Sequence, residues 1–179
     1  MAVFLSAGHH LKDSGAVYNG RQENLEAIKL RNIILNLCKS KGLKVIIDED
    51  TETLSQYLTR IKTGSGSVVL EIHFDASLIN TATGTTCLVG DDADRLDKAF
   101  AKEIVDVAAN VMGIKNRGVK AEAESRRGKL GLMREQGIVA LWEVCFISNN
   151  ADMAAYDANM HRLAGEVVLI LEKYDNIIV

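Results

Sequence analysis

Short apolar runs alternate along the chain with longer segments in which apolar residues recur at helical spacing. The runs, several of them rich in β-branched residues, predict strands, and the helical spacing predicts amphipathic helices. The predicted strands cover residues 3–7, 43–47, 68–73, 84–89 and 138–144, and the predicted helices cover residues 23–40, 51–61, 94–112 and 152–174. Strands and helices in this alternation predict an α/β fold with a largely parallel sheet.

Three further predictions concern a strand, a helix cap and a loop. Residues 84–89 fit a hairpin-like strand or an edge strand, and Thr51 is the predicted cap of the second helix. Residues 116–129 predict a basic loop that contains Arg117, Lys120, Arg126 and Arg127. A solvated charged loop is the ordinary interpretation of such a segment. The alternative is a loop that borders a substrate groove.

Composition narrows the class of protein. The 179 residues fit one domain, residues 1–179, and 47% hydrophobic with 25% charged residues is usual for a globular chain. A net charge of −3 gives no reason to expect nucleic-acid binding. No apolar run approaches the roughly 18 residues of a membrane span, and the N-terminus lacks a signal-peptide pattern. We therefore expect a monomer that is made in the cytoplasm.

Two histidines follow predicted strands directly. His9 comes after residues 3–7 and a glycine, and His73 ends the strand 68–73. The carboxyl ends of parallel strands meet at one edge of a sheet, where open α/β sheets bind ligands. Two imidazoles and a carboxylate leave an open position on zinc, so this pairing favours a metal site. The alternative for each histidine is a structural role.

Several acids could complete such a site. Glu23 opens the first predicted helix directly after the His9 loop, whereas Glu26 lies one turn further along and suits a solvated face better. Glu71 is two residues before His73, so it projects to the same side of that strand and favours a supporting role. Glu143 interrupts an apolar strand, where burial would raise its pKa as a general base requires. A buried ion pair is the alternative for Glu143.

Seven segments, in this order, resemble the zinc-dependent N-acetylmuramoyl-L-alanine amidases of the amidase-3 type, including phage and prophage endolysins. Their sequences are Ala7-Gly8-His9, Asp13-Ser14-Gly15-Ala16, Glu23, Ile72-His73-Phe74-Asp75-Ala76, Ala82-Thr83-Gly84-Thr85, Gly131-Leu132-Met133-Arg134 and Glu143-Val144-Cys145-Phe146-Ile147-Ser148-Asn149. The resemblance spans nearly the whole chain. It implies a single α/β domain with a mixed, mostly parallel sheet of about six strands flanked by helices on both faces.

The resemblance also implies roles for individual residues. His9, Glu23 and His73 would be the ligands of Zn²⁺, and Glu143 would be the catalytic acid/base. His10, Glu71 and Asp75 depart from the usual family residues and would line the substrate groove or support the ligands. Strand alternation would place Cys145 on the same side as Glu143, although a packed thiol is the more ordinary role.

The function implied is hydrolysis of the amide between the lactyl group of N-acetylmuramic acid and L-alanine, in peptidoglycan or muropeptides. Zinc-activated water would attack, with Glu143 moving the proton. Two alternatives stay open at this point: a zinc hydrolase of the same fold that cuts another amide, and an inactive peptidoglycan-binding domain. Without a signal peptide, release to the cell wall by phage-type lysis is one expected route, and host wall remodelling or recycling is another.

Overall fold

A six-stranded sheet forms the centre of the computed structural model, which describes residues 2–125 and 128–177. Its strands are β1 (Val3–Ala7), β4 (Val45–Ile47), β5 (Val68–Asp75), β6 (Thr85–Val89), β7 (Asn116–Ala121) and β8 (Ile138–Phe146). The other elements are the hairpin β2 (Val17–Tyr18) and β3 (Arg21–Gln22), the helices α1 (Glu23–Ser40), α2 (Leu54–Arg60), α3 (Arg95–Met112) and α4 (Asn150–Asp175), and the 3-10 turns η1 (Glu122–Glu124) and η2 (Gly131–Arg134).

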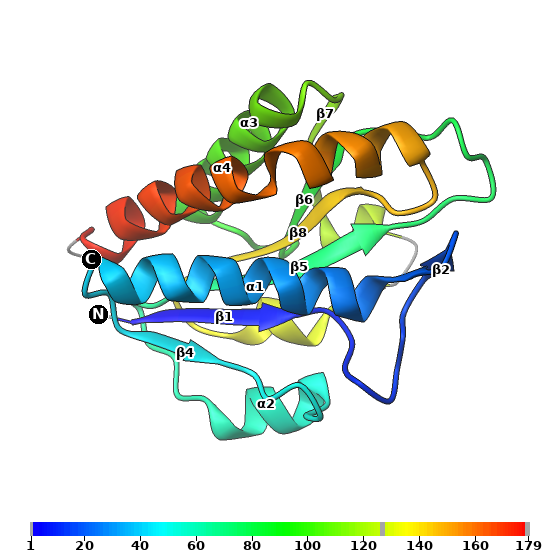
Figure 1. Cartoon of the computed structure of the whole chain (residues 1–179). Helices are drawn as coiled ribbons and strands as arrows, with labels where there is room; N and C mark the ends of the chain where they lie inside the picture. Colours follow the sequence, from blue (N-terminus) through cyan, green and yellow to red (C-terminus); the bar gives the residue numbers. More distant parts are fainter. Residues whose placement is uncertain (1, 126–127, 178–179) are drawn as a thin grey trace.

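The strand order β4-β1-β5-β8-β6-β7 confirms the mixed, mostly parallel sheet. Strands β4, β1, β5 and β8 run parallel, and β6 pairs with β8 in the antiparallel direction. The carboxyl ends of β1 and β5 therefore lie at the same end of the molecule, as their arrowheads show (Figure 1). The chain termini lie at the opposite end, away from the loops that follow β1 and β5.

Helices cover both faces of the sheet, as expected, but unequally. Helices α1, α3 and α4 pack on one face in the larger apolar core, which includes Leu5, Ile72 and Trp142 (Figure 1). The other face carries a smaller core around Phe4 and Val69, covered by α2 and η2. Alternating side chains along β1, β5 and β8 thus have apolar neighbours on both faces, which explains why these strands are nearly continuous apolar runs.

Two predictions at the far side of the sheet are wrong. Strand β6 is not an edge strand, because it pairs with both β8 and β7. The segment predicted as a basic loop begins as β7, the true edge strand, followed by η1. Charged side chains are common on edge strands, and here they hide the apolar alternation of a strand. Arg126 and Arg127 lie outside the described residues.

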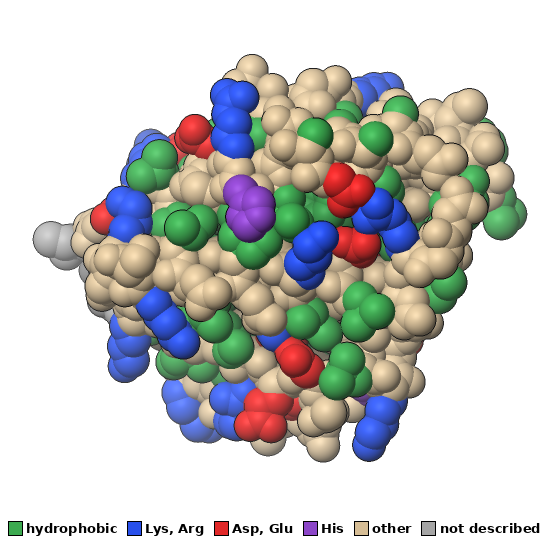
Figure 2. All heavy atoms as spheres, viewed as in Figure 1, with side chains coloured by type: hydrophobic (Ala, Val, Ile, Leu, Met, Phe, Trp, Pro, Cys, Tyr) green, Lys and Arg blue, Asp and Glu red, His purple; other side chains and the backbone are tan. Residues whose placement is uncertain are grey.

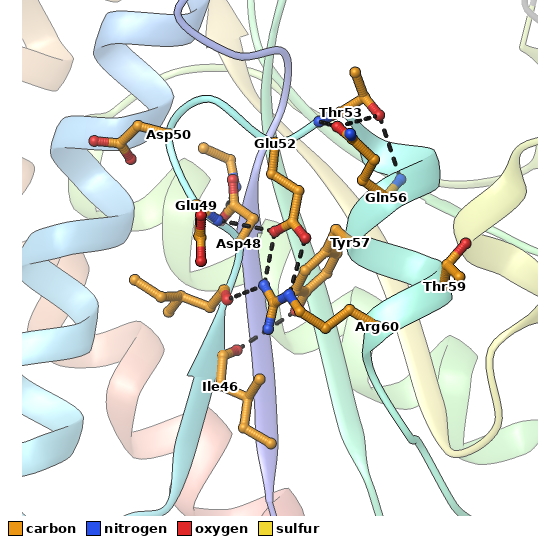
Figure 3. Close-up of polar contacts among 12 residues, drawn as sticks. Ile46, Asp48, Glu49, Asp50, Glu52, Thr53, Gln56, Tyr57, Thr59 and Arg60 are labelled. Atoms are coloured by element: carbon orange, nitrogen blue, oxygen red, sulfur yellow. Dashed lines mark hydrogen bonds and ion pairs between the residues drawn. The ribbon is translucent and has the colours of Figure 1, made fainter.

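The N-cap of helix α2 lies two residues later than the predicted cap at Thr51. Thr53 is the N-cap: its Oγ1 accepts from the Gln56 N–H, and the Gln56 side chain accepts from the Thr53 N–H (Figure 3). At the other end of the helix, Arg60 donates to both carboxylate oxygens of Glu52 at 2.9 and 2.7 Å and to a carbonyl of β4 (Figure 3). These contacts hold α2 against the end of β4, beside the loop that follows β1.

A bulge between β5 and β8 overturns the prediction for Cys145. Between the paired positions His73↔Glu143 and Asp75↔Phe146, β8 has one residue more than β5. The extra residue breaks the alternation, so Cys145 turns into the larger core instead of the Glu143 side. Its thiol packs 3.7 Å from the Met153 sulfur. Burial raises the pKa of the Cys145 thiol, as expected of an inert packed cysteine.

The outer surface fits the modest net charge. Over α1 and α4, lysine, arginine, aspartate and glutamate side chains are interspersed with apolar ones, without a large area of one charge (Figure 2). Among the described residues, no helix combines the length and the apolar character needed to cross a bilayer.

Candidate metal centre

Three side chains from three segments converge where β1 and β5 end. His9 lies in the loop after β1, Glu23 is the first residue of α1, and His73 lies near the end of β5. One ligand atom from each lies within 4.8 Å of the others, and among the described residues this is the one such group. The structure thus brings together the three predicted ligands.

Glu23 occupies the centre of this group. Its Oε1 lies 2.9 Å from His73 Nδ1, and its Oε2 lies 3.2 Å from His9 Nε2. The backbone N–H groups of Phe74 and Ala16 donate to the same two oxygens, at 3.2 and 2.9 Å. Each carboxylate oxygen is therefore fixed by one amide and faces one imidazole.

A second carboxylate stands behind each imidazole. Asp13 Oδ2 lies 2.8 Å from His9 Nδ1, and Glu71 Oε2 lies 3.6 Å from His73 Nε2. Metal-binding histidines usually direct their second nitrogen to a carboxylate, which fixes the ring and raises its basicity. Glu71 thus lies where a supporting role was predicted. Asp13 was not singled out, although its place four residues after His9 in a turn was a usable signal.

The charges of the group are strongly coupled. Burial lowers the pKa of His73, but the carboxylates of Glu23 and Glu71 outweigh it and raise the pKa to about 10. The pKa of His9 is raised above its usual value, chiefly by Glu23. Burial acts to raise the pKa of Glu23, yet the two imidazoles prevail and hold it well below its usual range. The group therefore favours a carboxylate surrounded by positive charge.

Two glycines allow this close approach. A Cβ at Gly8 would lie 2.4 Å from the His73 ring, and one at Gly15 would lie 2.5 Å from the His9 ring and 2.6 Å from the Glu23 carboxylate. Gly15 also has φ of +60°. His9 itself has φ of 66°, a left-handed conformation that is unusual for a side-chain residue and recurs at functional sites.

The fit of this group to a metal ion rests on one atom. His9 Nε2 is buried and makes no hydrogen bond with any described residue, although Glu23 Oε2 is 3.2 Å away. A buried ring nitrogen that approaches a carboxylate without hydrogen-bond geometry is suited to share a cation with it. Two imidazole nitrogens and one carboxylate are also a donor set that zinc accepts with a further position open. The residues fit Zn²⁺.

Glu143 lies beside this group in a cavity of about 630 Å³, whose wall also includes His9, Glu23 and Asp75. Glu143 is 6% exposed and is paired in register with His73 on the neighbouring strand. Side chains at paired positions of parallel strands point to the same face of the sheet. The predicted acid/base, two of the predicted ligands (His9 and Glu23) and Asp75 therefore line one cavity, whereas His73 lines a neighbouring cavity that His9 also borders.

His10 lies apart from that cavity. It lines a second cavity of about 320 Å³, on the side of Glu71 and Tyr57. Asn24, which is buried, donates to the His10 carbonyl at 2.9 Å and fixes the loop after β1 to α1. His9 and His73 line this second cavity as well, so His10 borders the ligand group from there and not from the wall of the Glu143 cavity. Glu26, the weaker ligand candidate, instead pairs with Arg21 at 2.8 Å.

Comparisons with known proteins cover nearly the whole chain. A family model described as N-acetylmuramoyl-L-alanine amidase matches residues 3–172. The chain is also 27% identical over 175 residues to an uncharacterized protein of Clostridium perfringens; the match covers 94% of this chain, which spans about half the length of that curated relative.

Solved structures share the fold. The catalytic domain of CwlV, an N-acetylmuramoyl-L-alanine amidase from Bacillus (Paenibacillus) polymyxa var. colistinus, is 23% identical with a TM-score of 0.78, covering 97% of this chain and 98% of that one. An N-acetylmuramoyl-L-alanine amidase from Clostridium difficile 630 is 21% identical with a TM-score of 0.77, covering 97% and 95%. Because the family model matches nearly the full length, the chain belongs to the N-acetylmuramoyl-L-alanine amidase family.

Proposed function

We propose that this domain is a zinc-dependent N-acetylmuramoyl-L-alanine amidase. It cuts the amide between the lactyl group of N-acetylmuramic acid and L-alanine in peptidoglycan or muropeptides. The observation that carries the proposal is the cluster of His9, Glu23 and His73 in an amidase-family chain, with Glu143 in a cavity that His9 and Glu23 also line. Among the described acids that line this cavity, Glu143 is the one that is paired with the predicted ligand His73 on a neighbouring strand.

The residues of the site would have separate roles in binding the metal and in moving the proton. His9, Glu23 and His73 would hold the zinc ion, which when bound polarises the scissile carbonyl and acidifies a water molecule. Asp13 and Glu71 keep the two imidazoles oriented through their second nitrogens.

Glu143 accepts the proton of the attacking water and passes it to the departing amine of L-alanine. Burial of its carboxylate keeps bulk water from competing for that proton. A nucleophilic side chain is not needed, in keeping with the packed thiol of Cys145.

The test separates metal binding from proton transfer. Glu143→Gln is expected to keep stoichiometric zinc, measured by elemental analysis, and to lose at least about a hundredfold in rate on purified sacculi. Glu166→Gln on α4, outside the cavity, is the matched control and should cleave like wild type. Mass spectrometry of the wild-type products should show free L-alanine amino termini and intact N-acetylmuramic acid.

Other outcomes would favour other functions. Products that carry a cut at a different amide would indicate a zinc hydrolase with another substrate. Binding of sacculi without any cleavage by the zinc-loaded wild type would indicate a peptidoglycan-binding domain. Equal rates for Glu143→Gln and wild type would contradict the role assigned to Glu143.

A further inference from the structure

One guanidinium enters the cavity that contains Glu143. Arg117 lies on β7 and lines that cavity together with Phe146 and Lys120. Its guanidinium carbon lies 5.1 Å from the centroid of the Phe146 ring, and its Nη1 donates to the Thr83 carbonyl at 3.3 Å. Stacking and one hydrogen bond thus fix the plane and the direction of the guanidinium.

The remaining edge of Arg117 has no acceptor among the described residues. Its Nε is buried and makes no hydrogen bond with any described residue. In a guanidinium, the Nε–H and one Nη2–H point in the same direction, and this pair matches the two oxygens of a carboxylate. A buried donor without an acceptor is costly, so a ligand that supplies one is favoured. The geometry suits a carboxylate.

The distribution of charge around the cavity indicates where a carboxylate would bind. Among the described residues, its wall carries the acids Glu23, Asp75, Glu124 and Glu143 and the cations Arg117 and Lys120, both on β7. The two described cations place positive charge on the β7 side of the cavity, where a substrate carboxylate is attracted. The carboxylate must therefore belong to a part of the substrate displaced from the scissile amide, toward β7.

We propose that Arg117 binds the free α-carboxylate of the second residue of the stem peptide and so determines which stems are cut. The inference rests on the proposed amidase function and deepens it. The second residue carries the carboxylate nearest to the scissile amide on the peptide side, and one cavity of about 630 Å³ contains both Glu143 and Arg117. Stems in which this carboxyl group is amidated lose the charge-assisted pair and are poor substrates.

The experiment uses two synthetic N-acetylmuramoyl tripeptides with amidated C-termini. They are identical except that the α-carboxyl group of the second residue is free in one and amidated in the other. For the zinc-loaded wild type, kcat/KM for the free acid should exceed that for the amide by roughly ten- to a hundredfold, the range for a hydrogen bond to a charged group.

Variants of Arg117 distinguish recognition from scaffolding. Arg117→Met should remove the preference by slowing cleavage of the free acid while leaving the amide within about twofold of its wild-type rate. Arg117→Lys keeps the charge without the paired donors, and should restore only part of the preference. Lys44→Gln, an equal change of charge at the far end of β4, is the matched control and should keep the full preference.

The results that would contradict the role of Arg117 differ from those that would contradict the amidase function. If the wild type cuts both tripeptides at the expected bond at equal rates, the amidase function stands and the role of Arg117 is wrong. If Arg117→Met slows both tripeptides equally, Arg117 only supports the fold near Thr83, and the inference is overturned. If the zinc-loaded wild type cuts neither tripeptide nor sacculi, the amidase function fails and the inference fails with it.

Discussion

Arg31 on α1 is the most deeply buried cation of the described chain, and replacing it should destabilise the domain strongly. The side chain is 2% exposed, and its Nη1 lies 2.8 Å from Asp48 Oδ1 at the end of β4. Asp48 is 5% exposed and also accepts from the Ala7 N–H at 3.2 Å. Burial raises the pKa of Asp48, and Arg31 opposes that rise. Arg31→Met leaves this carboxylate buried without its cation.

Removal of one partner of a buried ion pair costs about 3–5 kcal/mol of unfolding free energy. For a chain of this length that corresponds to a fall in Tm of roughly 6–20 °C. Urea unfolding followed by circular dichroism, with chelator present so that metal binding does not contribute, measures the loss. The Ala7 amide precedes Gly8 and His9, so we also expect weaker zinc binding by Arg31→Met.

A surface pair and a double variant provide the comparison. Arg60→Met breaks a pair with Glu52 in which the Arg60 side chain is 43% exposed, so solvent screening should keep its cost below that of Arg31→Met. Adding Asp48→Asn to Arg31→Met removes the buried charge but keeps an acceptor for the Ala7 N–H, so part of the lost stability should return. Arg31→Met with a loss no larger than that of Arg60→Met would refute the reasoning.

Three further predictions concern the metal centre. Gly8→Ala should abolish stoichiometric zinc uptake by elemental analysis, because the added Cβ would lie 2.4 Å from the His73 ring. Asp13→Asn should weaken zinc binding by roughly ten- to a hundredfold in a chelator competition, by loosening the imidazole that it orients. The pKa of His73 is raised to about 10 in the metal-free protein, so zinc must displace a proton from this ring. The affinity for zinc should therefore fall about tenfold for each unit that pH is lowered from 9 to 7. A zinc affinity that does not change with pH would contradict this prediction.

The strand ends could be predicted from the sequence because parallel strands bring their carboxyl ends together. Apolar runs placed β1, β5 and β8, and the residues that follow or interrupt them gave His9, His73 and Glu143. Helical spacing gave α1, and its first residue, Glu23, lies at the predicted site. Positions set by the period of a regular element carry over directly from sequence to space.

What the sequence could not show depends on contacts between distant segments. The bulge that turns Cys145 into the core comes from an extra residue of β8 relative to β5, and one strand alone does not reveal it. Strand β7 was mistaken for a loop because its charged side chains suit an exposed edge. The role of Asp13 depends on the left-handed backbone of His9, which turns the ring back toward it.

Glu23 shows why the helix register decides the site. As the first residue of α1, it faces amides from two other segments, the loop that contains Ala16 and the strand that contains Phe74. Glu26, one turn later, pairs with Arg21 instead, so a shift of three residues would remove the carboxylate from both imidazoles. Because the two amides fix Glu23 whether or not a cation is present, the ligand oxygens are oriented before metal arrives. A preorganised carboxylate loses little conformational freedom on binding, which favours tight zinc binding by only three protein ligands.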